Sequence, residues 1–187
     1  SASSGSNLAL SSGYMGGDHL GLIDFGQVKH LNLEQRLRFA RMIVALNVDD
    51  RKRVVQALLD MGHRTKYCSE ENLYTMAKLI YDSNDKERLK GYTNIQALLD
   101  DLQAQDPVVK VGEDYVLVGR VCIMLRGLGH ILKQPRSTSD VWLPLAKRLL
   151  VENGQWNDAD DELIRLQRQR RKLERRQTRA QQKKEEA

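Results

Sequence analysis

The sequence contains few cysteines and no long apolar run, and each absence excludes a class of protein. Cys68 and Cys122 are the two cysteines among 187 residues, too few for a disulfide-rich scaffold. We expect two reduced thiols in the core. No apolar run approaches the roughly 20 residues that a membrane-spanning helix needs, which argues against an integral membrane protein. The sequence also shows no charged n-region followed by an apolar segment, so we expect no signal peptide.

The body of the chain has little net charge, although the whole chain carries +5. Residues 165–187 hold ten Lys or Arg and three Glu, whereas residues 1–164 hold 20 basic and 22 acidic residues. The basic character therefore belongs to the C-terminal end, and the composition does not support a basic binding surface on the folded part. With 41% hydrophobic and 29% charged residues, the chain has the composition of a folded protein.

Apolar residues recur at spacings of three and four along most of the chain, which is typical of helices with one buried face. The pattern predicts helices over 33–46, 49–59, 70–80, 95–102 and 138–150, and a solvated helix over 160–187. Asn32, Ser69 and either Ser137 or Thr138 are the expected N-caps. Gly62 is the expected end of the second helix.

Residues 108–132 allow two interpretations. The β-branched residues at 108–111 and 115–118 could form a pair of short strands around Gly112. A long helix over 115–132 fits better, because the apolar residues continue as far as Leu132. This segment is apolar on most faces, so we expect it to be the central helix of the core.

The first 26 residues carry the one chemical signature of the chain. Two short apolar stretches, 8–10 and 20–23, flank a segment rich in Gly and Ser, and this pattern predicts a small β-hairpin. Asp24-Phe25-Gly26 follows the second stretch. An aspartate at the end of a buried strand can hold Mg²⁺ bridging nucleotide phosphates, because hard divalent ions take oxygen ligands. Asn7 precedes the first stretch, and Asn7 and Asp24 could converge on one metal ion.

Segments 7–10 and 21–29, with the helices after them, resemble the UbiB/AarF-type atypical kinases. The tract over 122–129 looks like the C-terminal helical region of that family, and the resemblance covers roughly residues 7–150. It implies a protein-kinase-like C-terminal lobe that binds ATP and Mg²⁺ through Asp24 and Asn7. Members are associated with ATP binding and hydrolysis, and with isoprenoid quinone (coenzyme Q) biosynthesis in mitochondria, plastids and bacteria. The resemblance therefore implies a mitochondrial or plastid location and contact with a quinone-biosynthesis complex.

The sequence departs from the family pattern just before Asn7. The family has Asp-Pro-x-Pro-Gly-Asn, whereas residues 2–7 read Ala-Ser-Ser-Gly-Ser-Asn, so that Ala2 stands where the catalytic-loop aspartate would be. A methyl group cannot act as a base. The nucleotide lysine and its glutamate partner, which belong to the N-terminal lobe, have no counterpart in the sequence. We therefore expect no catalytic residue and no phosphoryl transfer by this chain alone, as in a pseudokinase or a fragment.

The fold class expected from these patterns is mainly α with a small β-hairpin. Residues 1–6 are expected to be a linker or cut site, 7–152 a partial kinase-like C-terminal lobe, and 158–187 a basic helical tail. The alternative is a non-enzymatic helical interaction module, in which Asp24-Phe25-Gly26 is structural and the basic helix recruits a partner.

The basic tail has three interpretations: a solvated helix without a specific partner, attraction to an anionic membrane surface, and nucleic-acid binding. Nucleic acid ranks last because no aromatic residues accompany the charges. The four histidines lack the spacing of zinc ligands, and His63, which follows Gly62, is expected at the surface.

Overall fold

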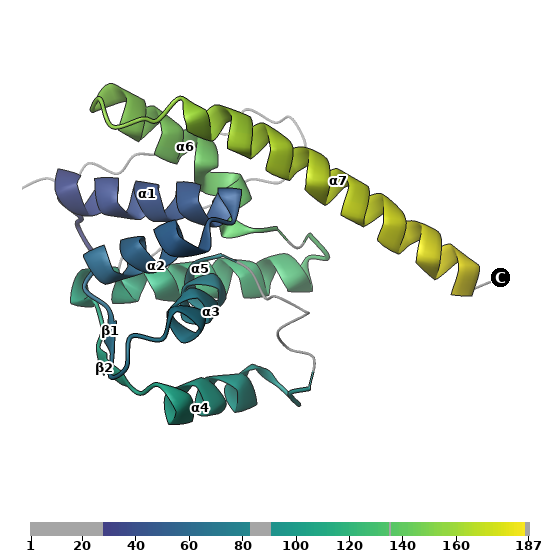
Figure 1. The fold of residues 1–187 in the computed structure, drawn as a ribbon, viewed down its shortest axis with the longest axis horizontal. Coiled ribbons are helices and arrows are strands. Elements are labelled where there is room, and N and C mark those ends of the chain that lie inside the picture. The colour runs from purple at the N-terminus through teal and green to yellow at the C-terminus, as the bar shows by residue number, and fades with distance from the viewer. Residues whose placement is uncertain (1–27, 83–90, 135, 186–187) are drawn as a thin grey trace, which may run out of the picture.

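Helix α1 (Leu33–Val48) lies at the centre of the folded body in the computed structural model, which describes residues 28–82, 91–134 and 136–185 (Figure 1). Every residue of α1 from Met42 to Val48 is buried. A helix that is buried on all faces belongs to the core of a bundle. Phe39 of α1 extends this core, because its ring makes edge-to-face contacts with Tyr81 at 5.8 Å and Trp142 at 5.5 Å between ring centroids.

The other elements are arranged around α1. Helices α2 (Arg51–Asp60), α6 (Thr138–Glu152) and α7 (Ala159–Glu185) contact it directly, and α3 (Glu70–Tyr81) connects α2 to α5 (Val116–Ile131). Helix α4 (Ile95–Gln105) lies at the end of the body opposite α6 and α7 (Figure 1). A short antiparallel sheet pairs β1 (Arg64–Thr65) with β2 (Val108–Lys110), and the 3₁₀ turn η1 (Glu113–Tyr115) leads into α5.

Side-chain caps set the helix starts as the sequence predicts. Asn32 accepts a hydrogen bond from the Gln35 N–H, and the Gln35 side chain accepts one from the Asn32 N–H, which completes a capping box. Ser69 and Ser137 cap α3 and α6. The second helix begins at Arg51 instead of Asp49, because Asp49 adopts the left-handed conformation (φ 59°) that ends α1.

The mainly helical fold with a small antiparallel sheet is confirmed, but the observed sheet is not the predicted hairpin. The hairpin predicted over 8–10 and 20–23 lies outside the described residues. The observed sheet joins β1 to β2, which are more than 40 residues apart in the chain. The helical interpretation of 115–132 is correct, since α5 covers Val116–Ile131.

The expectation that this helix is the central helix of the core is wrong. Among the residues of α5, Gly119, Cys122 and Arg126 are buried, and these lie on one narrow stripe at spacings of three and four. The stripe faces α3: a Cβ at Gly119 would lie 2.7 Å from Cγ2 of Ile80, and Arg126 donates a hydrogen bond to the Leu79 carbonyl at 2.5 Å. Helix α1 occupies the centre, and α5 lies at the edge.

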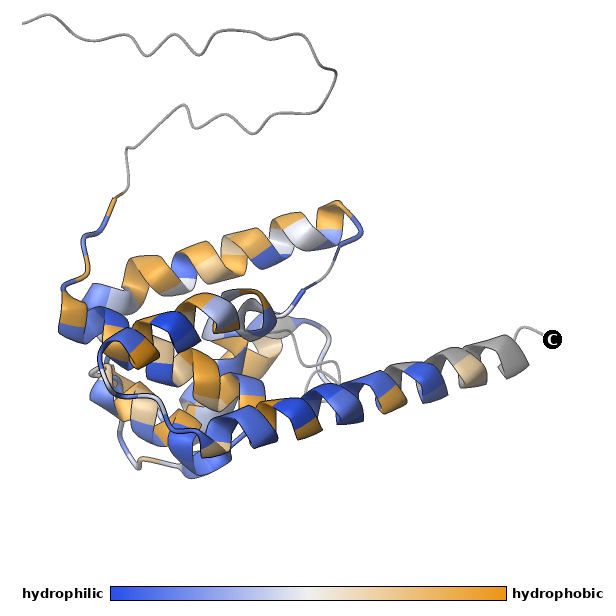
Figure 2. Ribbon diagram, turned by 90° about the horizontal axis from the view of Figure 1, so that it is seen from above, coloured by the Kyte–Doolittle hydropathy of each residue, from blue (hydrophilic) through white to orange (hydrophobic). Residues whose placement is uncertain are grey.

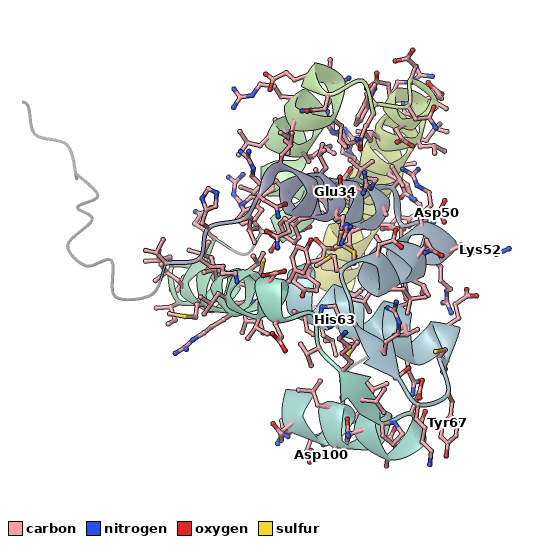
Figure 3. The ribbon with its side chains drawn as sticks, turned by 90° about the vertical axis from the view of Figure 1, so that its left-hand side faces the viewer. Glu34, Asp50, Lys52, His63, Tyr67 and Asp100 are labelled. Carbon is pink, nitrogen blue, oxygen red and sulfur yellow. The ribbon has the colours of Figure 1, made fainter. Side chains whose placement is uncertain are left out.

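His63 is buried, contrary to the expectation of a surface position. Gly62 has φ 92°, and the turn it makes carries His63 inward, where the side chain is 2% exposed (Figure 3). Its Nε2 lies 3.0 Å from the Tyr81 hydroxyl. Burial, with a smaller contribution from Arg64, lowers the pKa of His63 to about 4. The imidazole is therefore neutral in the folded protein at neutral pH.

Asp106 anchors the loop between β1 and α3. Its buried carboxylate accepts hydrogen bonds from Thr65 Oγ1 at 2.7 Å, the Tyr67 N–H at 2.7 Å and the Ser69 N–H at 2.8 Å. Burial opposes the ionised form, but these three bonds outweigh it and hold the pKa of Asp106 below its usual range. Cys68 lies in this loop with φ 53° and is exposed, so the expected core thiol is confirmed for Cys122 and wrong for Cys68.

His63 is expected to make stability depend on pH. Unfolded histidine binds a proton as the pH falls below about 6.5, whereas folded His63 stays neutral until about pH 4. Its contribution to stability is therefore complete above pH 6.5 and is lost as the pH falls toward 4. Between pH 7.5 and 5, wild type should lose about 2 kcal/mol more unfolding free energy than His63→Gln, measured by urea titration. The exposed His30→Gln is the matched control, and a wild-type slope in His63→Gln would contradict the prediction.

Asp106→Asn should destabilise the fold by about 2 kcal/mol, because an amide offers one acceptor oxygen where the carboxylate offers two. The matched control is Asp100→Asn, an exposed residue of α4 that is labelled in Figure 3 and is expected to change stability by less than about 0.5 kcal/mol. Equal unfolding midpoints for the two variants in urea would show that Asp106 does not anchor the loop.

Candidate functional site

The residues predicted to bind metal and nucleotide, Asn7 and Asp24, lie outside the described residues. What the structure describes is the place where the chain enters the body after them. Val28 to Asn32 lead into α1 beside the start of α5. The polar contacts at this junction decide how firmly the chain after Asp24 is held.

An ion pair fixes the junction. Lys29 Nζ lies 2.8 Å from Asp114 Oδ1, and Gln35 Nε2 donates to Asp114 Oδ2 at 2.5 Å. Asp114 belongs to η1, immediately before α5. The hydrogen bond from Lys29 lowers the pKa of Asp114 below its usual range. The Lys29 side chain, five residues after Asp24, therefore contacts the start of α5.

Gln35 connects two elements at this junction. Its Oε1 accepts the Asn32 N–H at 2.8 Å, which fixes the first turn of α1, while its Nε2 bonds to Asp114 of η1. One side chain thus couples the start of α1 to the start of α5.

A surface cleft of about 430 Å³ adjoins the junction. Its polar lining includes Asn32, Gln35, Arg38, Asp60, Lys110 and Asp114. Charges of both signs meet there, and two further acidic groups have partners. Glu34, labelled in Figure 3, accepts a hydrogen bond from Arg38 at 3.1 Å, and Gln56 donates to Asp60 at 2.8 Å. Within the described ranges no three His, Cys, Asp or Glu side chains are grouped so that they could hold a metal ion. The predicted magnesium site therefore depends on Asn7 and Asp24.

A second acidic cluster, at the end of α1, joins helices. Asp49 accepts hydrogen bonds from the Tyr74 hydroxyl and from Lys78 Nζ, the latter at 2.9 Å. Burial opposes the ionised form of Asp49, but these two bonds outweigh it and lower its pKa. The Arg51 guanidinium lies 4.9 Å from the Tyr74 ring centroid, within cation–π range. The cluster ties α1 and α2 to α3, which is a structural role.

Helix α7 is attached to the body along its first half. Asp160, 3% exposed, accepts two hydrogen bonds from Arg53 of α2, at 2.6 and 2.9 Å. Gln167 Nε2 and Arg171 Nη2 each donate at 2.8 Å to carbonyls at the end of α1, and Arg171 also bonds Asp140 of α6. Beyond this point α7 extends away from the body (Figure 1). The first half of the segment expected as a solvated tail is therefore packed against three other helices.

A cleft of about 500 Å³ lies between α6 and α7. Leu143, Pro144 and Ile164 supply its apolar lining. Two of its cations are paired, Lys147 with Asp161 and Arg165 with Glu162. Arg168 and Lys172 also line the cleft, and neither forms an ion pair with any residue in the part of the chain described here. The cleft can accept a partner that has an acidic and an apolar group.

Sequence reasoning missed this cleft because residues 160–187 have few apolar side chains. A signal was present in the spacing: Asp160, Ile164, Gln167 and Arg171 follow one another at intervals of four, three and four, which places them on one helix face. Three of the four are polar and reach partners on other helices, so a hydrophobic pattern does not reveal them.

No helix among the described residues is long and apolar enough to cross a bilayer. No protein-family model, curated protein or solved structure matches the chain.

Proposed function

We propose that the chain is the C-terminal-lobe part of a UbiB/AarF-like atypical kinase or ATPase that binds Mg²⁺–ATP and supports isoprenoid quinone (coenzyme Q) biosynthesis. The observation that carries the proposal is the order of residues 7–26: Asn7, two apolar stretches around a Gly- and Ser-rich segment, then Asp24-Phe25-Gly26. Asp24 is the principal metal ligand and Asn7 the second. The family resemblance also motivates a mitochondrial or plastid location.

The chemistry of the two side chains fits this role. A carboxylate and an amide oxygen are hard donors of the kind that Mg²⁺ takes in nucleotide sites. The bound metal ion would neutralise phosphate charge. Ala2 supplies no base, so the chain by itself binds nucleotide without transferring a phosphoryl group.

The junction supports the proposal because it contacts the body shortly after Asp24 in the sequence. Lys29 is held by Asp114, and Asn32 and Gln35 fix the first turn of α1. A metal ligand binds more tightly when its backbone is held in place before the ion arrives. Lys29 is the fifth residue after Asp24 in the sequence.

The alternative function is a non-enzymatic interaction module with a basic recruitment helix. The cleft between α6 and α7 favours it, since Arg168 and Lys172 lie beside the apolar residues Leu143 and Ile164. An anionic membrane surface or an acidic protein would fit this combination, and the absence of aromatic side chains among the charges disfavours nucleic acid.

Nucleotide binding predicts a thermal shift. Mg²⁺–ATP at ten times its dissociation constant should raise Tm by about 3 °C, and Asp24→Ala should abolish the rise because the metal loses its principal ligand. Asp18→Ala removes a carboxylate from the same segment and is the matched control that keeps the rise. EDTA should remove the effect in wild type. An equal shift in Asp24→Ala, or no shift in wild type at millimolar nucleotide, would reject the proposal.

The recruitment module predicts binding to anionic vesicles. Replacing Arg168 and Lys172 by Gln should weaken co-sedimentation with phosphatidylserine-containing vesicles about 30-fold, since each basic side chain near such a surface contributes about 1 kcal/mol. The control pair, Arg36→Gln with Lys52→Gln, makes the same charge change on α1 and α2, where Lys52 points away from the body (Figure 3). Equal weakening by both pairs would show that the cleft is not the binding surface.

A further inference from the structure

Helix α5 leaves a wide apolar face without cover from the residues that the structure describes. Eight large side chains at 116–132 are 45% to 78% exposed. They are Val116, Val121, Ile123, Met124, Leu125, Leu128, Ile131 and Leu132. A contiguous apolar surface of this kind marks a contact site, whereas apolar residues scattered singly do not.

Gly127 leaves room for close approach to this face. It lies one helical turn from Ile123 and Ile131, and a Cβ placed on it would meet no described atom within 4 Å. Glycine inside a helix costs about 1 kcal/mol relative to alanine, and no packing among the described residues explains that cost. Glycine does allow the backbone of another segment to approach.

The charges around the face point to an acidic occupant. Residues 116–137 contain four Lys or Arg and no Asp or Glu. Arg120, Lys133 and Arg136 of this set are exposed. An occupant that is apolar and carries negative charge would complement both the face and its rim.

Residues 8–25 of this chain have that composition. They include Leu8, Leu10, Leu20, Leu22, Ile23 and Phe25. Residues 1–27 contain two Asp and no Lys or Arg, so this part of the chain is apolar and acidic where the rim of the α5 face is basic.

Residues 8–25 also precede a point of the chain that contacts the start of α5. The Lys29–Asp114 ion pair holds the chain directly before Val116, the first residue of α5. Figure 2 shows residues 28–32 beside the first turn of α5. Helix α5 runs along one edge of the body and is largely hydrophobic. A helix of 16 residues is about 24 Å long, and 18 extended residues reach about 60 Å. The segment can therefore cover the whole face from its anchor.

We propose that residues 8–25 dock within the same molecule on the apolar face of α5. The docking does not depend on nucleotide binding, and its tests contain no nucleotide, so the two proposals can fail separately.

The first test measures how accessible the face is in the full chain. Cys68→Ser and Cys122→Ala remove the native thiols, and Met124→Cys or Leu163→Cys supplies one reporter thiol. Met124 on α5 is 62% exposed in the structure, and Leu163 on α7 is 40% exposed. We expect maleimide to label Met124→Cys at least tenfold more slowly than Leu163→Cys. Adding Leu22→Asp and Ile23→Asp should raise the Met124→Cys rate about tenfold and leave the Leu163→Cys rate unchanged.

Other occupants give different results in this assay. Protection that disappears on dilution would identify a second copy, and protection that requires anionic vesicles would identify a membrane; either result overturns the proposal. Equal labelling of the two reporters in dilute protein without vesicles overturns it too. Far-ultraviolet circular dichroism must show the same helix content in every variant.

The second test uses the sign of a Tm change. With the segment docked, Gly127→Ala should lower Tm, because the added methyl group obstructs the close approach. In the Leu22→Asp, Ile23→Asp background the same substitution should raise Tm by about 2 °C, since alanine is the better helix former. A rise in both backgrounds would show that nothing covers Gly127.

Discussion

The complete burial of α1 is the constraint on which the rest of the structure depends. From Met42 to Val48 this helix has no exposed side, so α2, α6 and α7 must surround it. Phe39 extends the core to α3 and α6 through Tyr81 and Trp142. Because α1 occupies the centre, the more hydrophobic α5 lies at the edge of the body. It contacts α3 through Gly119 and Arg126.

Carboxylates hold the surrounding elements in place. Asp49 joins α1 to α3, Asp106 orders the loop before α3, and Asp160 fixes α7 to α2. Each accepts hydrogen bonds from neighbouring groups, and these bonds account for the low pKa of Asp49 and Asp106. These three carboxylates join elements of the fold, and the proposed metal ligand is a different aspartate. Asp24 is the candidate.

Local signals in the sequence predicted the helices well, because caps and periodicity act over a few residues. Asn32, Ser69 and Ser137 cap the helices that they precede. Long-range placement was not predictable in the same way. Hydrophobicity alone could not show that α1 would displace α5 from the centre, or that Gly62 would turn His63 inward to meet Tyr81. Asp160 and Arg171 make polar contacts with distant helices, which a hydrophobic pattern in the sequence does not predict. The predicted ligands Asn7 and Asp24 lie outside the described residues.

The pairing of Arg53 with Asp160 determines how α7 is attached to the body. An aspartate that is 3% exposed and bound through both oxygens is stable only while its guanidinium partner is present, because an unpaired buried charge is costly. Helix α7 therefore depends on α2 for a stable start and is not an independent helix. The pair fixes the start of α7 to α2, and the far end of α7 extends away from the body.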